Sequence, residues 1–98
     1  MDSLDAIKEL GPVMTALGSI TRQRILMLFK TNRSMEISDI AKHFNLSRTA
    51  VVHHISVLRD AGVIKPNGSA NSVEVDWKLV SKTLRNAQTL VAPLAKAN

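Results

Sequence analysis

Two adjacent histidines, His53 and His54, are the residues best suited to chemistry in this chain, and they follow the stretch Ser47-Arg48-Thr49. An imidazole can bind a metal ion, transfer a proton or donate a hydrogen bond to a nucleic-acid base. Neighbouring positions of an α-helix point about 100° apart, so both rings cannot ligate one ion from the same helix. The third histidine, His43, belongs to another predicted helix. The spacing therefore favours separate roles for the pair.

No other group of residues predicts catalysis. Serines, histidines and aspartates are present, but they form no nucleophile elbow and no glycine-rich phosphate loop. The absence of cysteine excludes disulfides, thiolate metal sites and thiol redox sensing. We therefore expect a protein that is not an enzyme and that holds no cofactor or metal ion.

The distribution of charge favours a polyanionic partner. The formal net charge is +5, with residues 1–20 net acidic and residues 21–60 clearly basic. A basic centre on a small domain favours nucleic acid, although an ordinary solvated surface gives the same pattern. No apolar run reaches membrane-spanning length and no signal peptide is evident, so we expect a soluble, cytoplasmic protein without a membrane partner.

Apolar side chains at helical spacing predict about five helices around one small core, in a single domain covering residues 1–98. The first helix covers residues 3–17. Gly11-Pro12 interrupts its pattern, and Pro12 suits the first turn of a new helical piece.

The second predicted helix covers residues 20–30, and Ser19 or Thr21 is its expected cap. We expect the side chain of Arg22 to face solvent. A brief extended stretch follows over residues 34–38.

Two further helices, covering residues 38–61 together, are joined by a very short connection. Ser38 is the expected cap of the first. Asn45 tolerates the left-handed backbone that closes a helix, and Ser47 suits the cap of the next one. Gly62 ends the pair. Two helices with so short a connection predict a helix-turn-helix.

A β-hairpin is predicted next, over residues 63–79. Residues 72–79 alternate apolar and polar side chains, as a half-buried strand does. Residues 63–65 are the expected partner strand, which Pro66 should cut short, and Asn67-Gly68 is a strong turn signal. A hairpin that follows a helix-turn-helix is a wing.

The last predicted helix covers residues 81–95, with Ser81 as its cap, and Pro93 should end or kink it. The first and last helices carry more apolar side chains than one small core can cover. Their surplus faces are therefore predicted to meet a second copy of the chain. The expected dimer interface contains Leu4, Ile7, Leu84, Ala87 and Val91.

The helix over residues 48–61 has a predicted buried face and a predicted outward face. Val51, Ile55 and Leu58 form the buried stripe. His54 flanks this stripe, and we expect it to be partly buried and hydrogen-bonded to backbone. His53 points outward.

In a helix-turn-helix this outward face enters the DNA major groove with its amino end first. Arg48, Thr49 and His53 can donate to guanine or to phosphate, and Val52 can contact a thymine methyl group. The expected DNA-binding residues are Ser47, Arg48, Thr49, Val52, His53, Ser56 and, on the wing, Lys65.

Two stretches resemble the arsenical-repressor (ArsR-type) family of winged-helix regulators. One is "ALGSITRQRILMLF", which is similar to the family's Ala-Leu-Gly-Asp-Pro-Thr-Arg opening; the other is "ISDIAKHFNLSRTAVVHHISVLRDAGVI", which is similar to its helix-turn-helix. The resemblance covers about residues 16–79. It implies a homodimeric repressor, built on the first and last helices, that binds a roughly palindromic double-stranded DNA operator.

Several positions depart from that family pattern. Ile20 stands where proline is usual, and Val52 replaces a common serine. The wing tip, residues 67–71, is uncharged, while Glu74 and Asp76 are expected to point outward and repel phosphate. We therefore expect a modest contribution of the wing to DNA binding and a shallow dependence on salt.

The inducing signal stays open at this stage. Metal-sensing relatives use cysteines near the third helix or carboxylates and histidines on the last one. This chain has no cysteine, and residues 81–98 contain neither histidine nor carboxylate, which excludes metal sensing at those two sites. A small-molecule effector, a protein effector and control by concentration remain.

The sequence thus predicts a mainly α winged helix-turn-helix that places its residues 48–61 in the major groove as a dimeric repressor. A winged helix that binds protein is the alternative, which the uncharged wing tip and apolar Val52 favour. A third hypothesis is an atypical metal sensor that uses His43 or His53 across a dimer.

Overall fold

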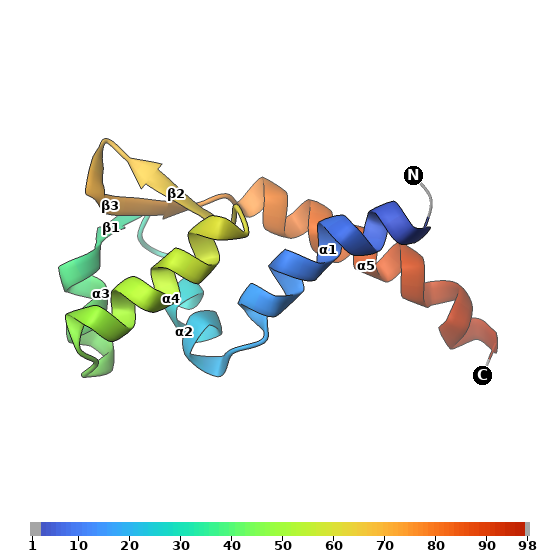
Figure 1. The fold of residues 1–98 in the computed structure, drawn as a ribbon, viewed down its shortest axis with the longest axis horizontal. Coiled ribbons are helices and arrows are strands. Elements are labelled where there is room, and N and C mark those ends of the chain that lie inside the picture. The colour runs from blue at the N-terminus through green and yellow to red at the C-terminus, as the bar shows by residue number, and fades with distance from the viewer. Residues whose placement is uncertain (1–2, 98) are drawn as a thin grey trace.

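A computed structural model describes the backbone of residues 3–97 and the side chains of residues 4–5, 8, 10–69 and 71–95. Within that range the chain forms five helices and one three-stranded antiparallel sheet (Figure 1). The helices are α1 (Ser3–Leu17), α2 (Ile20–Leu28), α3 (Ile37–Phe44), α4 (Arg48–Asp60) and α5 (Trp77–Ala97). The strands are β1 (Ser34–Glu36), β2 (Ile64–Asn67) and β3 (Ser69–Val75). The predicted fold class, mainly α with a small β-hairpin wing, is confirmed.

One hydrophobic core joins α2, α3, α4 and the sheet. Its fully buried side chains come from all of these parts and include Ile25, Ile40, Val51, Ile55, Leu58, Ile64 and Val73. Val13 and Ala16 attach the second half of α1 to the same core. Burying one aliphatic side chain of this size stabilises the fold by about 1.5–3 kcal/mol. The core therefore determines which face of α4 is left for solvent.

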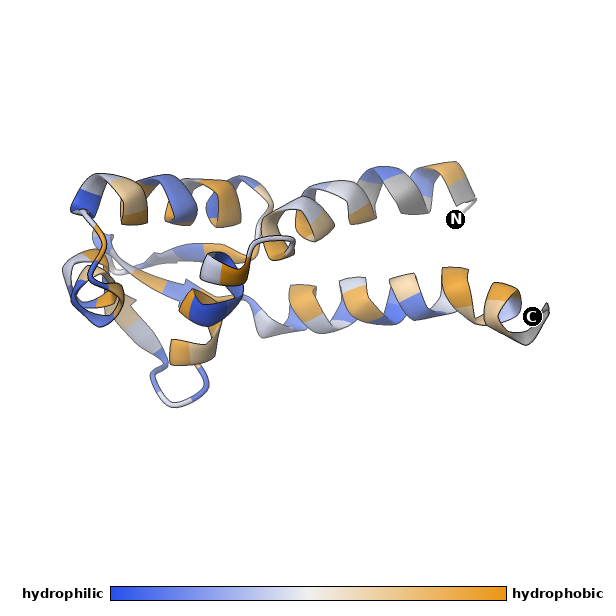
Figure 2. Ribbon diagram, turned by 90° about the horizontal axis from the view of Figure 1, so that it is seen from below, coloured by the Kyte–Doolittle hydropathy of each residue, from blue (hydrophilic) through white to orange (hydrophobic). Residues whose placement is uncertain are grey.

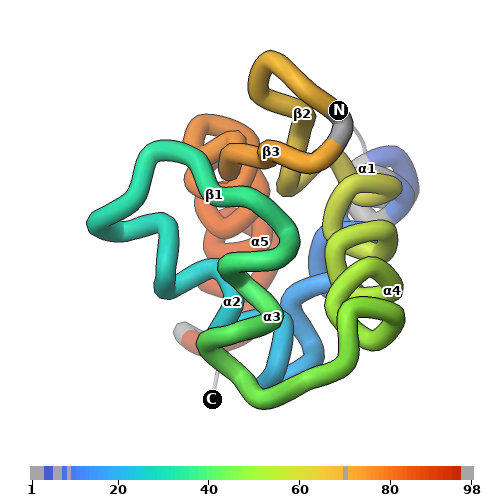
Figure 3. Tube along the Cα trace, turned by 90° about the vertical axis from the view of Figure 1, so that its left-hand side faces the viewer, coloured from blue at the N-terminus to red at the C-terminus, as the bar shows by residue number. Residues whose placement is uncertain are grey.

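The sheet has the order β1-β3-β2, with antiparallel pairing throughout (Figure 3). β2 continues through Pro66, which lies opposite Val73, and ends at Asn67. The prediction that Pro66 cuts this strand short is therefore wrong. β2 is an edge strand of the sheet, and edge strands tolerate proline. The predicted turn is confirmed, with Gly68 at φ 80° between the two strands.

The start of α5 is the largest departure from the prediction. The strand predicted over residues 72–79 ends at Val75, and Trp77 already belongs to α5. Asp76 explains the change, because its Oδ1 accepts the backbone N–H of Leu79 at 3.0 Å. A carboxylate that accepts this bond caps a helix, and the cap outweighs an alternation of side chains that suits a strand.

Four further helix positions also differ from the prediction. Ser81 lies inside α5 and does not cap it, and α5 continues past Pro93. Ser38 lies in the first turn of α3, which begins directly after β1 without a side-chain cap. α1 is one helix with Pro12 inside it. Proline removes one backbone donor, and the packing of α1 against α4 and α5 outweighs that loss.

α1 and α5 leave the core side by side and give the molecule its elongated shape of 46 × 26 × 23 Å (Figure 2). The two termini lie at the far end of this pair. Within residues 3–97, no helix combines the length and the hydrophobicity that crossing a bilayer requires.

Candidate nucleic-acid interface

Three consecutive residues set the angle between α3 and α4. Asn45 adopts left-handed backbone, with φ 51° and ψ 36°, and ends α3. The half-buried Leu46 packs against the core. The Ser47 Oγ accepts the backbone N–H of Ala50 at 3.1 Å and caps α4. The predicted turn and the predicted cap are both confirmed, and this short connection is that of a helix-turn-helix.

The two predicted faces of α4 are confirmed. Val51, Ile55 and Leu58 are each no more than 1% exposed. Gly62, at φ 80°, follows the helix and turns the chain toward β2. The opposite face of α4 is exposed along its whole length, and its residues are Arg48, Thr49, Val52, His53, Ser56 and Arg59. A duplex can therefore approach this face without unfolding any part of the chain.

The wing reaches the amino end of α4 through one contact. A terminal nitrogen of the Arg48 guanidinium donates to Asn71 Oδ1 at 3.4 Å, and both side chains are exposed. Asn71 was not among the predicted site residues, because its position beside Arg48 depends on how the hairpin folds over the helix. The contact places the uncharged wing tip next to the exposed face of α4.

The charged groups of the wing are paired with one another. The ammonium of Lys65 lies 3.8 Å from Glu74 Oε1, and the amide of Asn67 donates to Glu74 Oε2 at 2.9 Å. Asp76 is occupied as the cap of α5. Glu74 and Asp76, which were predicted to point outward and repel phosphate, are thus half-buried and each accepts a hydrogen bond. Lys65, predicted as the cation of the wing, has part of its charge offset by Glu74.

Arg22 is placed differently from the prediction, because it is half-buried and joins three helices. Its Nε donates to the carbonyl oxygen of Ala16 at 2.7 Å, and one terminal nitrogen donates to that of Thr15 at 3.1 Å. These carbonyls belong to the last turn of α1, where a cation is favourable. The other terminal nitrogen lies 3.3 Å from His54 Nδ1 on α4.

His54 is half-buried, as predicted, but its partner is the Arg22 side chain and not the backbone. Since a guanidinium can only donate, Nδ1 accepts and the imidazole is neutral in this contact. Burial, the Arg22 charge and the neighbouring His53 together lower the pKa of His54 below its ordinary value of 6.5. His54 thus supports the orientation of α4 from inside.

His53 and His54 lie in different surroundings. Their ring centroids lie 5.6 Å apart, with His53 on the exposed face and His54 toward Arg22. Among the side chains that the structure describes, no three histidines, aspartates or glutamates gather in a way that could hold an ion. The exposed face of α4 instead carries donors suited to a nucleic acid.

Residues 19–65 match the model of a family described as bacterial regulatory protein, arsR family. This segment belongs to the arsR family. It contains α2, the helix-turn-helix and the start of the wing, so the resemblance drawn from the sequence is confirmed. The family is one of regulators and not of enzymes.

One curated relative is the transcriptional repressor SdpR of Bacillus subtilis (strain 168), 42% identical over 52 residues. The match covers 53% of this chain and 57% of the relative, so the chain spans little more than half of that protein's length. Over those residues the chain is similar to a transcriptional repressor.

Solved structures extend the likeness of fold to the whole chain. An ArsR-like transcriptional regulator from Rhodococcus sp. RHA1 superposes with a TM-score of 0.82 at 22% identity, covering 98% of this chain and 89% of that one. A further ArsR family transcriptional regulator gives a TM-score of 0.71 at 18% identity, covering 92% and 90%. The arsR-type winged-helix fold therefore includes α1 and α5.

Proposed function

We propose that this protein is a dimeric, sequence-specific DNA-binding regulator of transcription that acts as a repressor. The observation that carries the proposal is the exposed face of α4, which presents Arg48, Thr49 and His53 while its opposite face is fixed in the core. A helix so exposed, following a short turn and beside a wing, has the geometry that enters a major groove.

The exposed residues divide by what they offer to a duplex. Arg48 and His53 can donate to guanine N7 and O6, and Thr49 to a base edge or a phosphate. Ser47 and Ser56 carry hydroxyls that can donate to phosphate oxygens. Val52, 44% exposed, can cover a thymine methyl group. We assign Lys65 a weaker phosphate contact, since Glu74 already lies 3.8 Å from its ammonium.

The proposed dimer uses the arms formed by α1 and α5. Leu4, Leu84 and Val91 are 60%, 49% and 55% exposed, and Ala87 is half-buried. Ile7, the fifth residue predicted for this interface, lies outside the described side chains. Large apolar side chains in such a group favour a protein interface. A second copy related by a twofold axis presents two α4 helices, which fits a palindromic operator.

Recovery of bound fragments from total genomic DNA tests this proposal directly. We expect enrichment of a small set of fragments that share an inverted repeat. Mobility shifts with those fragments should weaken as salt rises, with a shallow slope because the wing supplies few phosphate contacts. His53→Ala should relax base preference while leaving salt-dependent binding in place, because the phosphate contacts remain. Failure to enrich any fragment, with the chain folded, would contradict the proposal.

The second candidate function is a winged helix that binds a protein. Val52 on the exposed face of α4 and the partly offset charge of Lys65 on the wing favour it. This candidate predicts that the chain has no salt-dependent affinity for duplex DNA. The same mobility-shift titration therefore separates the two functions.

A further inference from the structure

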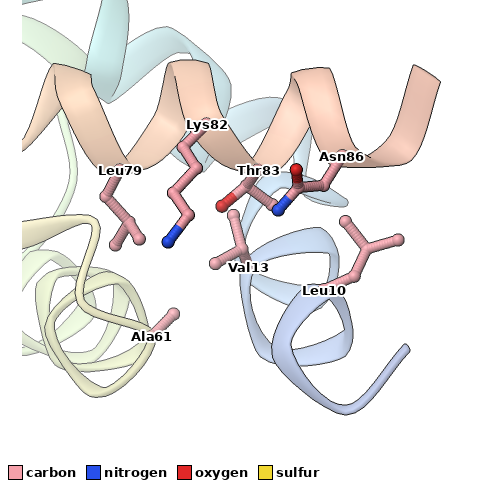
Figure 4. A pocket seen from close by; sticks show the side chains of 7 residues that line it. All are labelled: Leu10, Val13, Ala61, Leu79, Lys82, Thr83 and Asn86. Atoms are coloured by element: carbon pink, nitrogen blue, oxygen red, sulfur yellow. The ribbon is translucent and has the colours of Figure 1, made fainter. Parts of the chain in front are cut away.

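A cavity of about 280 Å³ lies where α1, α5 and the end of α4 meet (Figure 4). Its apolar lining consists of Leu10 and Val13 from α1, Leu79 from α5 and Ala61 after α4. A water molecule in the liquid occupies about 30 Å³, so this space suits a compound of about nine or ten non-hydrogen atoms. The volume fits a small metabolite.

The polar lining comes from one face of α5. Lys82, Thr83 and Asn86 follow Leu79 at helical spacing, so all four side chains point from α5 toward α1 and Ala61 (Figure 4). Thr83 is only 7% exposed. Within the described part of the chain, none of these three polar side chains has a hydrogen-bond or ion-pair partner. They present an ammonium, a hydroxyl and an amide to the cavity.

We infer that this cavity binds a small monocarboxylic acid with a compact apolar body. The carboxylate would accept from Lys82 and Thr83, since hydrogen bonds between charged groups are the strong ones. The body would lie against Leu10, Val13 and Leu79. The described lining residues include one cation and no carboxylate. A ligand with one carboxylate therefore fits this lining better than a ligand with two.

Occupation of the cavity acts on the proposed DNA-binding face through the end of α4, and this part of the inference rests on the proposed function. Ala61 is the C-cap residue of α4, and it lines the cavity. Gly62 follows it so closely packed that a Cβ there would lie 3.0 Å from Leu79 Cδ2. A ligand that moves Leu79 therefore moves the end of α4, and we expect weaker binding to DNA.

Titration calorimetry on the full chain tests the site without DNA. Benzoate and 4-methylpentanoate are the probes, and benzamide is the uncharged comparison with the same ring. We expect saturable binding of the acids in roughly the millimolar range or tighter, with benzamide about tenfold weaker than benzoate. Absence of binding by both acids, or equal binding of benzamide, overturns the inference.

Variants locate the site. Lys82→Gln should weaken benzoate binding about tenfold, because the charged partner is lost. Lys78→Gln is the matched control, since it removes the same charge one turn earlier on α5 and outside the cavity. Ala61→Leu should fill the cavity and block benzoate, with circular dichroism reporting the fold. Equal losses in the Lys82 and Lys78 variants would show a general effect of surface charge and overturn the assignment.

The effect on DNA is measured separately. With an operator fragment in hand, saturating benzoate should lower the affinity of the chain for DNA several-fold, and Lys82→Gln should abolish that response. Unchanged DNA affinity at saturation overturns the regulatory part. Failure of the chain to bind DNA at all contradicts the proposed function and leaves the calorimetric result standing, so the two failures are distinguishable.

Discussion

At the scale of single residues, the exposed and the half-buried side chains around α4 have opposite roles. Arg48 and His53 lie on the surface that we propose meets DNA. Arg22 and His54 lie behind that surface and connect α4 to the last turn of α1. A substitution in the first pair should change binding, whereas a substitution in the second should change stability.

Arg48→Ala should weaken binding to an operator fragment. If Arg48 contacts phosphate, the slope of log affinity against log salt should fall by about one, because one fewer counterion is released. If it reads guanine, the loss should be about 1–3 kcal/mol and confined to one base pair. Mobility shifts at several salt concentrations separate these outcomes. Arg24→Ala on the exposed side of α2 is the matched control, and equal effects of both variants would exclude a specific role for Arg48.

Stability should depend on pH through His54. The folded chain lowers the pKa of His54 below 6.5, so the unfolded chain takes up the proton more readily. The stabilisation is therefore present above about pH 6.5 and is lost as the pH falls toward the folded-state value. Thermal melts of wild type and His54→Gln, compared across this range, check the effect. The variant keeps an oxygen that can accept from Arg22, and its melting temperature should fall less steeply; parallel curves would refute the assignment to His54.

At the scale of elements, local capping decided where helices begin and end. Ser47 and Asn45 carry signals that need only their own neighbours, and both were predicted correctly. Asp76 carries a signal of the same kind, which the alternation of apolar residues through Trp77 obscured. Pro12 shows the opposite limit, because the packing of α1 against the rest of the chain outweighs the missing donor.

Asn45→Ala should destabilise the helix-turn-helix by about 1 kcal/mol, since a side chain with a Cβ and no local hydrogen bond strains left-handed backbone. Asn45→Gly should be neutral to within a few tenths, because glycine adopts this conformation freely. Urea unfolding of the three proteins measures the differences. Equal stability of the alanine and glycine variants would show that the turn relaxes out of the left-handed conformation.

At the scale of the whole molecule, α1 and α5 are the parts that one copy of the chain leaves incompletely covered. They extend beyond the core and keep large apolar side chains in solvent, among them Leu84 and Val91. The small cavity between them lies on the inner side of the same pair of helices. The arms therefore combine the proposed dimer interface with the proposed ligand site.

Leu84→Glu and Val91→Glu should convert a dimer into a monomer, because a carboxylate in the interface would be desolvated without a partner. Met27→Glu is the control, since Met27 is 52% exposed and belongs to α2 rather than to the arms. Sedimentation velocity reports the oligomeric state directly. A wild-type chain that sediments as a monomer at all concentrations would refute the proposed dimer.

The sequence by itself determined the order of the helices, the turn with its left-handed Asn45, the cap at Ser47 and the buried stripe of α4. These features depend on local backbone preference and on helical periodicity, which neighbouring residues specify. Only the tertiary structure decided the partners of Arg22, the pairing of Lys65 with Glu74, the place of Asn71 beside Arg48 and the cavity below Lys82. Each of these joins residues far apart in the chain, so it depends on how the elements pack and cannot be read from any single stretch.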